Sequence, residues 1–170
     1  MSDVDLHVLT TGGTIDKVYF DALSEFEVGE PAMRFVLREA NITLDYEITS
    51  LMKKDSLELT DDDRAAIRDA ALASEARCIL VTHGTDTMVQ SALVVEAALG
   101  EVTDRTVVFT GAMLPASQRS TDAIFNVGFA IAAARISPPG VYVAMNGRLF
   151  RPGDVRKDRA ANRFVGGENA

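Results

Sequence analysis

Short apolar runs alternate with longer segments of helical periodicity along this chain. The apolar runs are nearly continuous instead of alternating in polarity, which is typical of strands that are buried on both faces. They predict strands over residues 5–10, 44–51, 76–83, 105–111 and 140–147. Between them, apolar positions at helical spacing predict helices over residues 31–40, 60–73, 86–99 and 121–136.

The strand–helix–strand order predicts an α/β fold with a doubly wound, mostly parallel sheet. The 170 residues suffice for one domain with a sizeable core, and we expect residues 1–170 to form that single domain. Residues 159–170 lose the apolar pattern, so we expect them to be a frayed tail. In an open parallel sheet, ligands bind beyond the carboxyl ends of the strands, so the loops that follow the strands are the candidate sites.

Composition and charge exclude several classes of function. The apolar fraction of 47% argues against disorder, and the net charge of -8 argues against a nucleic-acid partner, although residues 148–159 are locally basic. Cys78 is the single cysteine, which excludes an internal disulfide and is typical of a reducing compartment. We see no apolar signal-peptide core and no run near the roughly 20 residues of a membrane span. These features predict a cytoplasmic protein without a membrane partner.

Two loops after predicted strands carry the clearest chemical signals. TTGGTI at 10–15 lacks the third glycine of a dinucleotide-binding fingerprint and the Gly-Lys-Ser/Thr of a phosphate loop. HGTDT at 83–87 has two interpretations: Thr85 or Asp86 caps the following helix, or both residues are catalytic. A hydroxyl becomes a useful nucleophile beside a base, so the catalytic interpretation requires Lys157 to lie near Thr85.

Four sequence blocks resemble the bacterial-type L-asparaginase family: TTGGTI, VTHGTDTM, FTGAM and DVRK, in this order. The resemblance covers the whole chain and corresponds to the larger N-terminal domain of the family, without its smaller C-terminal domain. It implies hydrolysis of the side-chain amide of L-asparagine, and in some members L-glutamine, to the acid and ammonia. It also implies no metal, no organic cofactor, and a homodimer or higher homo-oligomer around a small-molecule site.

The resemblance implies a catalytic role for each matching residue. Thr14, in TGGTI, corresponds to the threonine that forms the acyl-enzyme. Thr85 and Asp86, in HGTDT, correspond to the second threonine and the aspartate of the family. Lys157 stands where the family has its lysine. Thr85 and Lys157 would relay protons, and Asp86 would hold the lysine or the substrate ammonium.

Substrate contacts are implied in the same way. Ser56, in KDSLEL, resembles the serine that holds the substrate α-carboxylate, and Asp86 would also bind the α-amino group. The carbonyl of Ala112 would accept a hydrogen bond from the substrate amide. Main-chain amides of the glycine-rich loops, Gly13 among them, would bind the oxyanion.

Two departures from the family pattern, one residue of the lid and the smaller C-terminal domain, leave the function with alternatives. The family carries a tyrosine in a lid after TGGTI, whereas Phe26 stands at that position here, and Tyr19 in the same loop is the candidate replacement. Without that hydroxyl and without the second domain, the chain could be a weakly catalytic or non-catalytic module that binds asparagine or aspartate. An open site would also suit a larger, related amide.

Overall fold

The computed structural model describes residues 4–100 and 103–167, and it confirms an α/β fold with a mostly parallel sheet. The six strands of this sheet lie in the order β4–β1–β5–β6–β7–β8. The first five run parallel and correspond to the predicted strands, while β8 pairs antiparallel with β7 at one edge. The bounds are β1 (Leu6–Gly12), β4 (Tyr46–Lys54), β5 (Cys78–Thr82), β6 (Thr106–Thr110), β7 (Gly140–Met145) and β8 (Arg148–Phe150).

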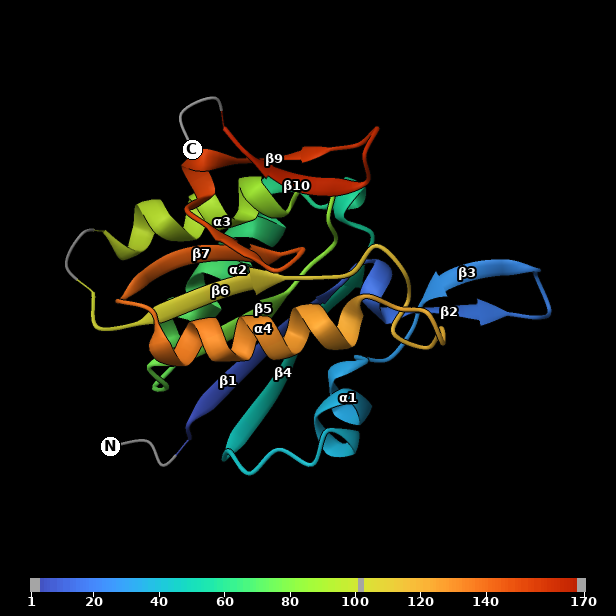
Figure 1. The fold of residues 1–170 in the computed structure, drawn as a ribbon, viewed down its shortest axis with the longest axis horizontal. Coiled ribbons are helices and arrows are strands. Elements are labelled where there is room, and N and C mark those ends of the chain that lie inside the picture. Colours follow the sequence, from blue (N-terminus) through green and yellow to red (C-terminus); the bar gives the residue numbers. More distant parts are fainter. Residues whose placement is uncertain (1–3, 101–102, 168–170) are drawn as a thin grey trace.

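Helices cover both faces of the sheet, which makes it doubly wound (Figure 1). Successive side chains of a strand point to opposite faces. In β6, Val108 accordingly packs with α1 and α4, whereas Val107 and Phe109 pack with α2 and α3. Because both faces are buried, the strand sequences are continuously apolar. The bounds are α1 (Met33–Glu39), α2 (Asp61–Ala73), α3 (Met88–Leu99) and α4 (Ala123–Ile136).

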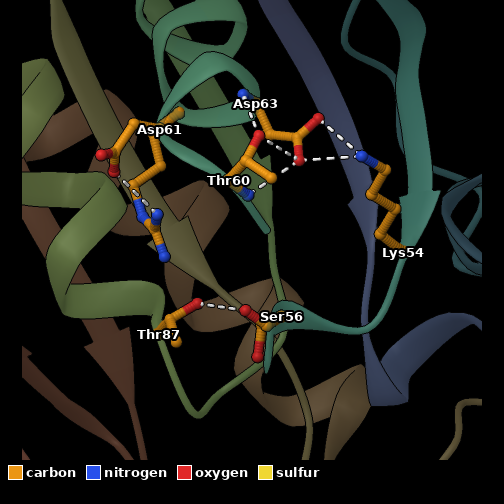
Figure 2. A network of polar contacts seen from close by, with 7 residues as sticks. Lys54, Ser56, Thr60, Asp61, Asp63 and Thr87 are labelled. Carbon is orange, nitrogen blue, oxygen red and sulfur yellow. Dashed lines mark hydrogen bonds and ion pairs between the residues drawn. The ribbon is translucent and has the colours of Figure 1, made fainter. Parts of the chain in front are cut away.

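The start of α2 confirms the predicted N-cap at Thr60. The Thr60 hydroxyl accepts a hydrogen bond from the amide of Asp63, and the Asp63 carboxylate accepts one from the amide of Thr60 (Figure 2). This reciprocal capping box satisfies two backbone donors. The Lys54 ammonium lies 2.8 Å from the same carboxylate and holds the pKa of Asp63 below its usual range.

Replacing Thr60 with alanine is expected to lower the free energy of unfolding by about 1 kcal/mol, because the Asp63 amide loses its acceptor. Thr60→Ser keeps the acceptor and serves as the matched control. Urea titration followed by circular dichroism measures both variants. Equal losses in the two variants would show that the hydroxyl is not what stabilises this helix start.

Two antiparallel hairpins lie outside the central sheet, and the apolar pattern did not predict either. One joins β2 (Lys17–Phe20) to β3 (Glu25–Val28) and projects away from the sheet (Figure 1). The other joins β9 (Val155–Asp158) to β10 (Arg163–Gly166). The prediction of a frayed tail over residues 159–170 is therefore wrong for 163–166, because these residues form β10 and Phe164 packs into the core that α3 also lines. Residues 168–170 of that tail lie outside the described residues.

Candidate active site

The strand order places the candidate loops at one point of the sheet. After β1 the chain crosses to β4 on one side, and β5 lies on the other side of β1. This reversal of strand order is where open α/β sheets leave a crevice at the carboxyl ends of their strands. The loop after β1 contains Gly13 and Thr14, and the loop after β5 contains Gly84, Thr85 and Asp86. The topology thus brings both sequence blocks to the same edge.

Glycines let these loops approach each other closely. Gly13 has a φ of 81°, and a Cβ there would lie 2.4 Å from the backbone of Gly84. A Cβ on Gly84 would in turn lie 2.6 Å from the Ser56 side chain. The Gly13 amide donates to the carbonyl of Lys54 at 2.9 Å. The glycines therefore fix the packing of three loops, and a direct contact of Gly13 with a substrate stays a prediction.

Thr85, Asp86 and Lys157 meet at the carboxyl edge of the sheet. Lys157 Nζ donates to Thr85 Oγ1 at 2.8 Å and to Asp86 Oδ1 at 3.0 Å. Neither Thr85 nor Asp86 caps α3: Thr87 occupies the N-cap position, so the capping interpretation of this motif is wrong. Thr85 is buried, and the side chains of Lys157 and Asp86 are mostly buried. We call Thr85, Asp86 and Lys157 the relay cluster.

The β9–β10 hairpin positions Lys157. Val155 in β9 and Phe164 in β10 are buried in the core that α3 also lines, and the Phe164 amide donates to Asn146 Oδ1. These contacts hold the strand, and Lys157 extends from it toward the loop after β5. Arg159 lies two residues further on and places Nη1 3.1 Å from Asp86 Oδ1. In the sequence, Arg159 is only part of the basic cluster at residues 148–159. Its ion pair with Asp86 depends on the β9–β10 hairpin, which the apolar pattern did not predict.

Thr14 begins a 3-10 turn, η1 (Thr14–Asp16), and is half-buried. It lines a pocket of about 210 Å³ together with Lys17, Phe26, Pro115 and Gln118. Phe26 thus lies at the wall of the pocket that contains Thr14. Tyr19 pairs with Phe26 across the hairpin, with the ring centroids 5.5 Å apart, and its side chain is 53% exposed. The catalytic role of Tyr19 stays a prediction.

Ser56 lies in the loop after β4, at the start of the 3-10 turn η2 (Ser56–Glu58), and is buried. Its carbonyl accepts a hydrogen bond from the Thr87 hydroxyl at 2.7 Å, which joins this loop to the one after β5 (Figure 2). The neighbouring Asp55 forms an ion pair with Lys17 at 2.8 Å, and Lys17 holds the pKa of Asp55 below its usual range. This pair ties the β2–β3 hairpin to the Ser56 loop. Sequence reasoning assigned no role to Asp55.

The loop after β6 completes the edge. Ala112 is buried, and the preceding Gly111 carbonyl accepts from Asn126 Nδ2 at 3.0 Å. Asp122 accepts hydrogen bonds from the amides of Met113 and Leu114 instead of capping α4 with its side chain. The loop is thereby held rigidly beside η1, to which a hydrogen bond of 3.1 Å joins the amide of Ala116 and the carbonyl of Ile15.

His83 is structural in this arrangement. Its ring is completely buried between the Gly84 carbonyl and the Ser91 hydroxyl, each at 2.7 Å. Burial lowers the pKa of His83 to about 4, so the ring is neutral at pH 7. A carbonyl can only accept, so Nδ1 donates to Gly84 and Nε2 accepts from Ser91. His83 therefore fixes the loop that carries Thr85.

Asp16 is the last residue of the 3-10 turn η1, which begins at Thr14. It is 3% exposed, and its Oδ1 accepts a hydrogen bond from the amide of Ala32 at 2.8 Å. Burial raises the pKa of Asp16 to about 7, with Glu30 raising it further and Lys53 opposing the shift. The ordinary value is 3.8, so the folded state holds a proton that the unfolded state releases between these values.

The contribution of Asp16 to stability should therefore fall as the pH rises from about 4 to about 7, because at this residue the unfolded state binds fewer protons in that window. The lowered pKa of His83 contributes in the opposite direction, so the effect of Asp16 is measured as the difference between the wild type and a variant. Asp16→Asn removes the titrating carboxyl group and keeps a side-chain oxygen that can accept the hydrogen bond from the amide of Ala32. We expect the stability of Asp16→Asn relative to the wild type to grow with pH, at no more than about 1.4 kcal/mol per pH unit. Urea unfolding at several pH values, with Asp21→Asn in the exposed hairpin turn as control, measures this. Parallel pH curves for the wild type and Asp16→Asn would contradict it.

Residues 4–100 and 103–167 contain neither a cluster of metal-ligating side chains nor a membrane-spanning helix. No group of three or more His, Cys, Asp or Glu side chains there is arranged to hold a metal ion. None of the helices there is long and apolar enough to cross a membrane.

Fold and site together define an α/β protein with a candidate threonine–lysine site at the switch point of its sheet. The family described as "Asparaginase, N-terminal" matches residues 5–164. The chain belongs to this family, as the four sequence blocks indicated.

Relatives and solved structures agree with this assignment. An "L-asparaginase" of Thermococcus kodakarensis is 31% identical over 152 residues, which are 85% of this chain and 45% of that protein. A "Probable L-asparaginase periplasmic" of Haemophilus influenzae is 28% identical over 165 residues, 90% of this chain and 46% of that protein. The solved thermostable L-asparaginase from Thermococcus kodakarensis superposes with a TM-score of 0.81 at 27% identity, over 95% of this chain and 50% of its own. The chain thus spans about half the length of the relatives it matches.

Proposed function

We propose that this chain hydrolyses the side-chain amide of L-asparagine to L-aspartate and ammonia, with Thr14 as the nucleophile. The observation that carries the proposal is the hydrogen bond of 2.8 Å between Lys157 Nζ and Thr85 Oγ1, beside Asp86. Two segments separated by 71 residues supply these groups, and capping of α3 does not explain them. We infer L-asparagine as the amide substrate because the relatives are named L-asparaginases.

The proposed reaction has two steps. Lys157 first releases a proton to solvent and becomes a neutral amine. Thr14 Oγ then attacks the amide carbon while its proton passes through the Thr85 hydroxyl to Lys157, which delivers it to the departing ammonia. Water then attacks the acyl-enzyme through the same relay and releases aspartate. Asp86 and Ser56 hold the amino-acid end of the substrate, the carbonyl of Ala112 accepts from the amide, and main-chain amides stabilise the oxyanion.

Ammonia release from L-asparagine and L-glutamine by the purified chain tests this function. Release that saturates with L-asparagine concentration is the expected result. A folded chain that releases no ammonia from either amide would refute the proposal for this chain, and a larger amide would then be the next substrate to assay.

Phe26 favours a second candidate, a module that binds asparagine or aspartate with little turnover. The pocket wall beside Thr14 carries a phenyl ring, which has no hydroxyl to assist a nucleophile. Calorimetric binding of L-aspartate without ammonia release from L-asparagine would identify this function. Association into a homodimer or higher homo-oligomer and a cytoplasmic location stay predictions.

A further inference from the structure

Asp86 is engaged by two cations at one oxygen. Lys157 Nζ lies 3.0 Å and Arg159 Nη1 lies 3.1 Å from the same Oδ1. The two cations differ in environment, because the Lys157 side chain is 16% exposed and that of Arg159 is 66% exposed. Lys157 is thus part of the interior of the site, whereas Arg159 reaches Asp86 from the solvent side.

The local charge balance follows from these contacts. Asp86 contributes one negative charge, and Lys157 and Arg159 contribute two positive ones. The carboxylate is therefore already neutralised by Lys157, and Arg159 adds an excess positive charge at the rim. A ligand ammonium that approaches Asp86 meets a repelling charge and a competitor for the same oxygen.

We propose that Arg159 determines specificity by competing with a substrate α-ammonium for Asp86, so that the site favours side-chain amides whose α-nitrogen is acylated or absent. This inference rests on the proposed function of the same site. A ligand without an α-ammonium leaves the Arg159–Asp86 contact intact. An acyl oxygen or a carboxylate at that position also gains the guanidinium as a hydrogen-bond donor.

The chain offers a matched control for this role. Arg156 lies on the same strand, β9, and is exposed. Side chains alternate along a strand, so Arg156 points to the face opposite that of Lys157. Arg156→Gln and Arg159→Gln change the net charge equally, and only Arg159→Gln removes a contact with Asp86.

Binding of L-aspartate and of succinate, which differ by the α-ammonium, tests the proposal without depending on turnover. Titration calorimetry measures both ligands on the wild-type chain and the two variants. For Arg159→Gln, we expect L-aspartate to bind about two- to fivefold more tightly relative to succinate, because an exposed ion pair contributes that much. For Arg156→Gln, the ratio of the two dissociation constants should stay at its wild-type value.

The outcomes separate this proposal from the proposed function. An equal ratio in all three proteins, or equal changes in both variants, would overturn the role of Arg159 even if ammonia is released. A shifted ratio in Arg159→Gln alone would support it even if the chain turns over no amide. Failure of both ligands to bind any of the three proteins would overturn both proposals.

Discussion

Thr14→Ala is expected to lower the rate of ammonia release from L-asparagine by about a thousandfold or more, because no acyl-enzyme can form without the hydroxyl. Thr14 lies in the pocket beside Phe26, one residue after the glycine that packs against Gly84. The rate is measured with a coupled ammonia assay at saturating substrate. Binding of L-aspartate should survive, since Ser56 and Asp86 remain in place.

Folding should be unaffected by this substitution. Within residues 4–100 and 103–167, no hydrogen bond uses the Thr14 hydroxyl, and the side chain is only half-buried. Thr14→Ser keeps the hydroxyl and is the matched control; it should retain measurable turnover. If Thr14→Ala released ammonia at the wild-type rate, the nucleophile would be another group, and Thr85 would be the next residue to replace.

Much of the central sheet could be predicted because its physical cause is local in the sequence. Strands buried on both faces need continuous apolar runs, and β5 and β6 show them directly. The meeting of Thr85 with Lys157 was also expected, since both residues follow predicted strands of the sheet in the sequence, although Lys157 lies in β9 of the second hairpin. The motif resemblance selected this pair from many polar loop residues.

The two hairpins could not be predicted from the pattern because tertiary contacts stabilise them. Phe164 gives β10 its place in the core, and a single aromatic residue in a polar segment carries no periodicity. The β2–β3 hairpin is mostly exposed, so burial imposes no alternation on its sequence. The contact between Arg159 and Asp86 was missed for the same reason, because the β9–β10 hairpin that carries Arg159 was not predicted.

The glycines show a different limit. TTGGTI and HGTDT suggested loops that let a ligand approach the main chain, yet Gly13 and Gly84 approach each other, and Gly84 also approaches Ser56. A glycine that is needed for its backbone angles and a glycine that is needed for a close contact cannot be told apart in the sequence. Which partner approaches a glycine is set by loops distant in the chain, so only the three-dimensional arrangement distinguishes a ligand from another loop.

Lys157→Ala is expected to lower ammonia release by about a hundredfold or more, because Thr85 loses the group that exchanges its proton. Asp86 keeps Arg159 as a partner, so its carboxylate is not left without a cation. The loss of stability should therefore be about 1 kcal/mol, near that of an exposed ion pair, instead of the larger cost of isolating a buried charge. Lys54→Ala also removes an ion pair, with Asp63, and should keep wild-type turnover.

A rescue experiment separates proton transfer from positioning at Lys157. Alanine leaves space where the lysine side chain lay, and ethylamine supplied in solution can place a primary amine near Thr85. If Lys157 moves protons, ethylamine should restore part of the rate in Lys157→Ala and have no such effect on Thr14→Ala. Restored binding of L-aspartate without restored turnover would instead show that Lys157 acts by orienting Asp86. Wild-type turnover in Lys157→Ala without any amine would exclude both roles.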